Sequence, residues 1–259
     1  MKDFNYSGIS YFKSGKGDAI VLLHGYLESK EIWCDFATQL AENFLVIIPD
    51  LPGHGKSELP NENLSLETMA KSVKTVLDKE NIQKCFLVGH SMGGYVALAF
   101  LQLFPERLNA LSLFHSAPYA DTEEKQNKRD REIKIINEGK IAQVYKAHFP
   151  KTFANENVDK FKSEIEKMNQ RAKSMKPEGI IAALEAMKRR PDRSGLLKNA
   201  KIPIQYIIGA KDNFIPMSIL DKLQLPDNSE LVVLENSGHM GFIEEPENSL
   251  KAIWNFYRH

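Results

Sequence analysis

The stretch Phe86-Leu87-Val88-Gly89-His90-Ser91-Met92-Gly93-Gly94 leads from one apolar run into another, which continues over residues 95–104. It places the pattern G-x-S-x-G between a predicted strand and a predicted helix. An abrupt turn from strand to helix forces its central residue into a strained conformation, and glycines two positions to either side leave room for it. We therefore expect Gly89 and Gly93 to form a sharp turn that exposes the Ser91 hydroxyl at a helix N-terminus, where negative charge is stabilised.

Strand and helix patterns alternate on both sides of this turn. Continuous apolar runs, typical of strands buried on both faces, occupy residues 19–23, 44–48 and 85–88, and further strands are predicted at residues 108–114, 204–208 and 231–234. Apolar residues recur at helical spacing over residues 66–77, with Ser65 as the N-cap, and a last helix begins at Pro246. This alternation predicts an α/β fold with a doubly wound, mostly parallel sheet.

Residues 116–200 have a different character, because strand patterns disappear there and helical patterns rich in Lys and Glu replace them. Two of the predicted helices, one after Asn155 and one from Pro177, each carry an apolar stripe. The stripes include Phe161, Ile165, Met168, Ile180, Leu184 and Met187. We expect a helical cap over residues 116–200, inserted into a core formed by residues 1–115 and 201–259.

The cap contains 19 basic and 13 acidic side chains. If each helix turns its apolar stripe inward, the charges face water, where salt screens them. We therefore expect a substrate cavity under the cap that is roofed by Phe, Met and Ile side chains and suits neutral groups.

A serine hydroxyl is a weak nucleophile that needs a base, and the base needs a carboxylate to orient it. His239 is the predicted base, because it lies in a loop just after the strand pattern 231–234, at the sheet edge where α/β active sites form. Asp212 occupies the equivalent loop after the preceding strand. The chain order Ser91, Asp212, His239 is the order used by enzymes with this type of serine turn. The competing histidines are His24, His54, His90, His115, His148 and His259.

The alkoxide that forms during such a reaction needs two N–H donors. One is predicted to be the backbone N–H of Met92, directly after the nucleophile. The other is expected from the loop His24-Gly25-Tyr26-Leu27, with the Tyr26 N–H as the candidate.

Taken together, these segments resemble the α/β-hydrolase superfamily over nearly the whole chain. The resemblance rests on His24-Gly25, Asp50-Leu51-Pro52-Gly53-His54-Gly55-Lys56-Ser57, Gly89-His90-Ser91-Met92-Gly93-Gly94, Gly209-Ala210-Lys211-Asp212 and Gly238-His239. It implies an α/β-hydrolase fold with Ser91 as nucleophile, Asp212 as acid and His239 as base, and with the cap as a lid. The sequence is similar to small capped carboxylesterases and lactonases, and also to the carbon–carbon lyase of the menaquinone pathway.

The sequence thus predicts a serine hydrolase that cleaves carboxylic esters of small to medium neutral acyl groups through an acyl-enzyme on Ser91. One alternative is a carbon–carbon bond hydrolase or lyase that acts on an acidic substrate and needs an arginine in its pocket. Another is a slow-turnover ligand receptor on the same fold, which rapid turnover of a simple ester would exclude. The candidate arginines of the cap are Arg129, Arg131, Arg171, Arg189, Arg190 and Arg193.

Composition limits the remaining possibilities. The 259 residues include 34 Lys and Arg and 34 Asp and Glu, so the chain lacks the excess of positive charge that nucleic-acid binding requires. Its N-terminus has no signal-peptide pattern and no apolar run is long enough to span a membrane, so we expect a cytoplasmic monomer or homodimer that acts on a small molecule. Cys34 and Cys85 are expected to be buried free thiols, and the absence of metal-ligand spacing predicts neither a metal nor a cofactor.

Overall fold

The computed structural model describes residues 1–61 and 63–258, so Glu62 and the candidate base His259 lie outside the described residues. Within them the sheet has eight strands in the order β1-β2-β4-β3-β5-β6-β7-β8. β2 pairs antiparallel with β1 and β4, and all other neighbours are parallel. The strands are β1 (Lys2–Tyr6), β2 (Ile9–Ser14), β3 (Ala19–Leu23), β4 (Leu45–Pro49), β5 (Cys85–His90), β6 (Leu108–Phe114), β7 (Ile204–Gly209) and β8 (Ser229–Leu234). The predicted doubly wound, mostly parallel sheet is confirmed.

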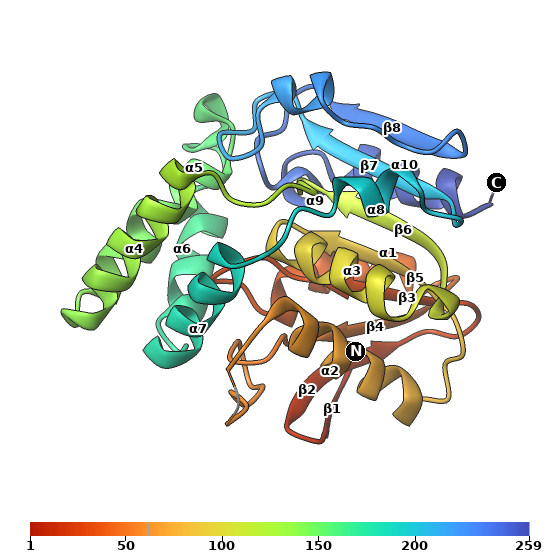
Figure 1. Cartoon of the computed structure of the whole chain (residues 1–259), viewed down its shortest axis with the longest axis horizontal. Coiled ribbons are helices and arrows are strands. Elements are labelled where there is room, and N and C mark those ends of the chain that lie inside the picture. The colour runs from red at the N-terminus through yellow and green to blue at the C-terminus, as the bar shows by residue number, and fades with distance from the viewer. Residues whose placement is uncertain (62, 259) are drawn as a thin grey trace.

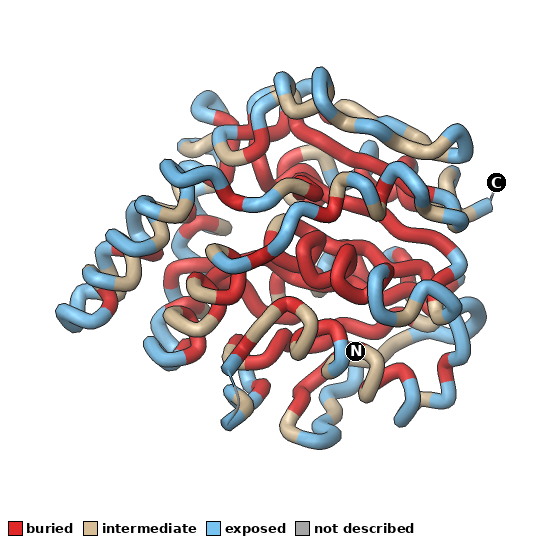
Figure 2. The backbone as a smooth tube through the Cα atoms, in the orientation of Figure 1, coloured by how far each residue is buried: buried red, intermediate tan, exposed pale blue. Residues whose placement is uncertain are grey.

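Helices cover both faces of this sheet. α2, α3 and α8 lie in front of it in the view of Figure 1, and α1 and α10 lie behind it. The bounds are α1 (Cys34–Leu40), α2 (Leu66–Lys79), α3 (Met92–Leu103), α8 (Ser194–Lys198), α9 (Gly241–Glu244) and α10 (Pro246–Arg258). Because helices cover both faces, every residue of β3, β5 and β7 is buried, which explains why their sequences are largely apolar (Figure 2).

Most element boundaries agree with the sequence patterns. α2 begins after Ser65, whose hydroxyl accepts from the Thr68 N–H while the Thr68 hydroxyl accepts from the Ser65 N–H, which is a capping box. α3 begins at Met92, three residues earlier than the periodicity indicated, because the turn at Ser91 leads straight into the helix. Cys85 is buried, but the expectation is wrong for Cys34, which lies on the partly exposed first turn of α1.

The four helices α4 (Glu123–Asn137), α5 (Ile141–Thr152), α6 (Lys162–Ala172) and α7 (Pro177–Lys188) follow β6. They stand beyond the carboxyl ends of the parallel strands, on the left of Figure 1. The helix expected directly after Asn155 begins only at Lys162, because residues 155–157 form a single 3₁₀ turn. The fold therefore carries a helical insertion; its exact limits at residues 116 and 200 stay a prediction.

Candidate active site

Ser91 stands at the turn between β5 and α3 in a backbone conformation that non-glycine residues rarely adopt, with φ 50° and ψ −114°. A Cβ atom on Gly89 would lie 2.5 Å from the Gly93 carbonyl oxygen, and one on Gly93 would lie 2.5 Å from the Leu23 carbonyl oxygen. Neither position can therefore hold a side chain. A residue in such a conformation carries strain of order 1–3 kcal/mol. The hydrogen bond from the Ser91 N–H to the Phe114 carbonyl (3.0 Å) helps to keep Ser91 in this conformation.

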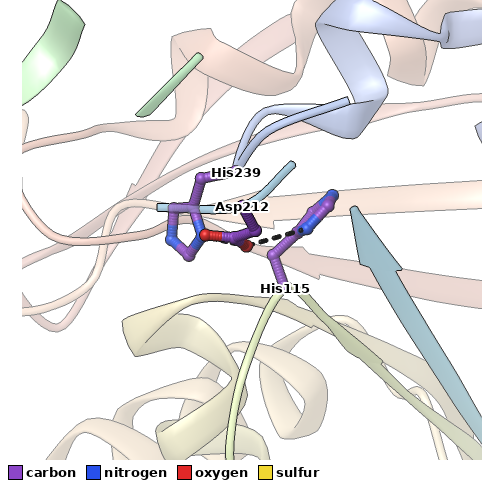
Figure 3. Close-up of side chains that lie close together, drawn as sticks. All are labelled: His115, Asp212 and His239. Carbon is purple, nitrogen blue, oxygen red and sulfur yellow. Dashed lines mark hydrogen bonds and ion pairs between the residues drawn. The ribbon is translucent and has the colours of Figure 1, made fainter. Parts of the chain in front are cut away.

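Asp212 and His239 are in direct contact at the carboxyl ends of β7 and β8 (Figure 3). His239 Nδ1 lies 2.7 Å from Asp212 Oδ2, while Asp212 Oδ1 accepts from the N–H groups of Phe214 (2.7 Å) and Ile215 (3.0 Å). Burial alone would raise the pKa of Asp212, but the attraction of His239 and the hydrogen bonds from the His115 and His239 side chains hold it well below its usual range. The carboxylate is therefore ionised and fixed in place.

His115, at the end of β6, is a second histidine on the same carboxylate. Its Nδ1 lies 3.2 Å from Asp212 Oδ2, and its Nε2 accepts from the Gly241 N–H at 3.2 Å. Burial lowers the pKa of His115 to about 4, so the ring is neutral near pH 7 and carries one proton. The Gly209 N–H also points at Nδ1 (3.1 Å), but the ionised Asp212 oxygen is the stronger partner. We therefore assign the proton to Nδ1, which donates to Asp212.

The donor atoms of His115, Asp212 and His239 lie within 4.8 Å of one another, as the ligands of a metal ion do. In a tetrahedral zinc site with bonds of about 2.0–2.2 Å, neighbouring ligand atoms lie about 3.3–3.5 Å apart. The 2.7 Å between His239 Nδ1 and Asp212 Oδ2 is a hydrogen-bond distance instead. The arrangement fits a network that shares protons better than it fits a metal centre.

A buried ion pair lies behind the serine turn. His90 Nδ1 donates to Glu28 Oε2 (3.1 Å) and its Nε2 donates to the His239 carbonyl (2.9 Å). Burial by itself lowers the pKa of His90, but the Glu28 charge and these hydrogen bonds outweigh it and raise the pKa. The pKa of Glu28 is correspondingly lowered to about 2, against the effect of burial. Because Glu28 also accepts from the Gly25 N–H (2.7 Å), the pair joins the loop of Tyr26 to the loop of His239.

The helical insertion is bonded to the His239 loop as well. Glu244 Oε1 accepts from the Gly238 N–H (2.8 Å), and its Oε2 accepts from the Ala154 N–H (2.9 Å) and the Asn157 side-chain amide (2.8 Å). The contact is so close that a Cβ atom on Gly238 would lie 2.3 Å from the Ala154 nitrogen. This explains why glycine precedes His239.

Ser91 and His239 line one cavity of about 100 Å³ beneath the insertion. Among the described residues, no hydrogen bond joins the Ser91 hydroxyl to His239, as is common in ligand-free active sites. The Tyr26 side chain also lines the cavity. The backbone N–H groups of Tyr26 and Met92 donate to no other described residue, so both are free to bind a ligand. The remaining lining residues are Tyr95, Lys125, Lys128, Arg129, Glu132, His148, Met187, Phe214 and Ile215.

This lining corrects the expectation that charges of the cap lie outside the cavity. Four charged side chains of α4 line it, and Met187 is the only member of the predicted apolar stripes that does. The stripe residues Ile165, Met168, Ile180 and Leu184 are buried, so they fill the interior of the insertion rather than the roof of the cavity. Arg129 is the one candidate arginine among the lining residues.

The other histidines have structural roles or lie in the cavity wall. His24 Nε2 accepts from the Leu51 N–H (2.9 Å), which ties the loops after β3 and β4 together. His148 packs edge-on against Tyr26, and burial lowers its pKa to about 3, so it is neutral. The sequence did not distinguish His115 from these, because only the folded sheet places it beside Asp212.

The sheet, the serine turn and the acid–histidine pair define an α/β-fold hydrolase. The chain belongs to the α/β hydrolase fold family, which it matches over residues 18–246. It is 27% identical to the pimeloyl-[acyl-carrier protein] methyl ester esterase of Aeromonas hydrophila, over 96% of this chain and 98% of that one. The 2-hydroxy-6-oxononadienedioate/2-hydroxy-6-oxononatrienedioate hydrolase of Escherichia coli is also 27% identical, over 96% and 90% of the two chains. A malate-bound thermophilic esterase from Thermogutta terrifontis has a TM-score of 0.90 at 28% identity, with 96% and 93% covered.

The matches to mycobacterial proteins are partial. Proteins of Mycobacterium tuberculosis and Mycobacterium bovis are 38% identical over 100 residues, and the match spans 29% of their length and 39% of this chain. Among the helices in the described residues, none has the length and apolar character that crossing a membrane requires.

Proposed function

We propose that the chain is a serine hydrolase that cleaves carboxylic esters through an acyl-enzyme on Ser91. The observation that carries this proposal is the pair of His239 and ionised Asp212, which borders the same small cavity as Ser91. The resemblance to esterases along nearly the full length of the chain supports it.

In the proposed reaction, His239 Nε2 takes the proton of the Ser91 hydroxyl as the oxygen attacks the ester carbonyl. The N–H groups of Tyr26 and Met92 stabilise the negative oxygen that results. His239 then gives its proton to the leaving alcohol, so the ester C–O bond breaks and an acyl-Ser91 remains. Water, deprotonated by the same histidine, releases the carboxylic acid and restores the serine.

Asp212 holds the His239 ring so that Nε2 faces the serine, and it stabilises the positive ring that forms. In this proposal His115 is a positioning residue. Its Nδ1–H donates to the same Asp212 oxygen that receives His239. Together with the two backbone donors on Oδ1, this leaves the carboxylate no freedom to rotate.

Labelling with a fluorophosphonate tests the nucleophile directly. We expect one adduct, on Ser91, and none on the Ser91→Ala variant, followed by turnover of short aryl esters by the unlabelled protein. Labelling elsewhere, or no turnover of any ester in a panel of increasing acyl length, would contradict the proposal. Binding of such an ester without turnover would support the ligand-receptor alternative.

A carbon–carbon bond hydrolase acting on an acidic substrate is the second candidate. Lys125 and Lys128 in the cavity wall favour it, and the related Escherichia coli hydrolase is named for dioate substrates. Loss of the absorbance of 2-hydroxy-6-oxononadienedioate in the presence of the protein would support this activity. Turnover of simple esters with no change in that absorbance would exclude it.

A further inference from the structure

Helix α4 turns a charged face toward Ser91. Lys125, Lys128, Arg129 and Glu132 line the cavity, and their spacing of three, four and seven residues from Lys125 puts them on one side of the helix. The cavity is therefore charged on the side of α4, while most of its other lining residues are apolar, as is usual for ligand pockets.

The three cations of this face differ in how far they are already neutralised. Arg129 forms an ion pair with Asp121 and is held by both carboxylate oxygens, and Arg190 binds the same carboxylate (2.6 Å). Lys125 and Lys128 form no ion pair with any described carboxylate. The Lys128 ammonium lies 5.4 Å from the ring centre of Phe214, another lining residue, so it stays at the cavity edge. These two ammonium groups are the cations of the cavity lining that no ion pair holds.

The floor of the cavity holds a matching hydrogen-bond donor. Tyr26 is only 6% exposed, and its buried hydroxyl lies beside Glu132 without a close hydrogen bond to any described residue. A buried hydroxyl without a partner is costly, so a ligand atom that accepts from it is favoured. An anionic oxygen would satisfy both this hydroxyl and the lysines.

Glu132 is the one acidic side chain in the lining. Burial raises its pKa even though Lys128 and Arg129 oppose that shift. Even when Glu132 is ionised, its single charge can offset only one of the two lysines. The α4 side of the cavity therefore keeps a net positive charge.

We propose that the substrate of this site is an ester with a second, ionised carboxyl group, bound by Lys125 and Lys128 and by the Tyr26 hydroxyl. The proposal rests on the ester hydrolysis proposed above and names its substrate class. A cavity of about 100 Å³ is small beside the roughly 300–1,000 Å³ of typical ligand pockets. It suits a monoester of a short dicarboxylic acid.

Matched esters test this specificity in the full-length protein. Monomethyl succinate differs from methyl butanoate in a carboxylate that replaces a methyl group, and monomethyl glutarate differs from methyl pentanoate in the same way. We expect higher kcat/KM for the anionic member of each pair at low ionic strength, and we expect its advantage to shrink as salt screens the lysines. An equal or better rate for the neutral member at low salt would overturn the proposal.

The double variant Lys125→Gln/Lys128→Gln locates the effect. We expect it to lower the ratio of anionic to neutral kcat/KM by roughly tenfold, since the charged contacts of two exposed lysines are lost. Lys134→Gln is the matched control, because Lys134 is exposed on the same helix and does not line the cavity. We expect this control to leave the ratio unchanged. A ratio that falls equally in both variants, or in neither, would contradict a specific role for Lys125 and Lys128.

A binding measurement separates this inference from the proposed reaction. Calorimetry with monomethyl glutarate and the Ser91→Ala variant requires no turnover, and we expect affinity to fall roughly tenfold when the two lysine substitutions are added. Binding that depends on the lysines in a protein that hydrolyses no ester would refute the reaction and support the anion site. Ester turnover without lysine-dependent binding would refute the anion site alone.

Discussion

The serine turn and helix α4 face each other across the cavity, and they are built by opposite means. Around Ser91 the backbone fixes the geometry, because side chains at Gly89 or Gly93 would collide with main-chain oxygens. On α4 the backbone is an ordinary helix, and its contribution to the cavity comes from its side chains. In the proposed function the two regions therefore have different roles: the core holds the reacting groups, and the insertion selects the substrate.

The two regions also differ in their ion pairs. Glu28 and His90 are buried in the core and bonded to loops on both sides of Ser91. On the insertion, Lys188 pairs with Asp130 at the surface. Buried and exposed ion pairs respond differently to mutation and to pH. Substitutions in the core and in the insertion therefore test whether the two regions differ as described.

The largest effect is expected from Ser91→Ala. It should lower kcat for an ester by roughly 10⁴–10⁶, because the nucleophile, base and acid act as a unit. Steady-state kinetics and a thermal melt would be measured together. The melting temperature should not fall, because the substitution removes only the hydroxyl group and keeps the Cβ atom at the strained turn. More than a tenth of the original rate would show that another group is the nucleophile.

Asp212→Asn should reduce kcat by about 10⁴ with little change in substrate binding. The asparagine cannot accept from His239 and His115 as the ionised carboxylate does, so the His239 ring loses its correct tautomer. Measurement of kcat and of inhibitor affinity in the same variant tests this split. Nearly normal activity would mean that a different carboxylate orients the base.

Glu28→Gln should destabilise the core by about 3 kcal/mol, because it leaves the His90 charge buried without its partner. The effect depends on pH. Glu28 has a lowered pKa, so its stabilisation is present above its ordinary value of 4.5 and is lost as pH falls toward 2. His90 has a raised pKa, so its stabilisation is full below its ordinary value of 6.5 and is lost as pH rises through the raised value.

Melting curves of the original protein and the Glu28→Gln variant should therefore differ most between about pH 4.5 and 6.5. The two melting temperatures should converge as the pH rises through the raised pKa of His90. A difference that stays constant up to alkaline pH would mean that His90 is neutral in the folded protein.

Removal of the His115 ring tests its positioning role with a smaller expected effect. His115 has φ 49°, a conformation that both glycine and asparagine tolerate, so His115→Gly and His115→Asn avoid added strain. The glycine variant loses the donor to Asp212 and should lower kcat about tenfold. The asparagine side chain retains a donor and should recover most of the rate. Equal rates in the two variants would mean that the hydrogen bond to Asp212 has no effect on turnover.

The smallest effect is expected on the outer face of the insertion. Lys188→Gln breaks the exposed pair with Asp130 and should shift the melting temperature by no more than about 1 °C, with ester turnover unchanged. A change in melting temperature as large as that of Glu28→Gln would mean that the exposed ion pair of the insertion stabilises the protein as much as the buried pair of the core.

Sequence reasoning reached the parts of this molecule that are decided locally. The turn at Ser91 and the buried strands β3 and β6 follow from neighbouring residues, since sterics and continuous apolar runs act over short distances. β1 and β2 were not predicted, because their sequences KDFNY and ISYFKS mix polar and apolar residues at the antiparallel edge of the sheet.

Contacts between segments far apart in the sequence were harder to predict. His115 and Asp212 are 97 residues apart, and no spacing rule links them. Helix α4 buries only Ile136 among its fifteen residues, so its sequence carries no apolar stripe to show which face turns inward. The charged stripe from Lys125 to Glu132 was the available signal. It became interpretable only when the fold placed that stripe above Ser91.

Glu244 limits which segments could replace the insertion during evolution. This carboxylate belongs to α9, yet it is satisfied partly by Ala154 and Asn157 of the insertion and partly by the Gly238 N–H beside His239. An insertion transplanted from another protein would leave it buried without the donors of Ala154 and Asn157, next to the histidine. Recombination therefore cannot exchange this segment freely. A replacement insertion must supply hydrogen-bond donors to Glu244, or the sequence of α9 must change as well.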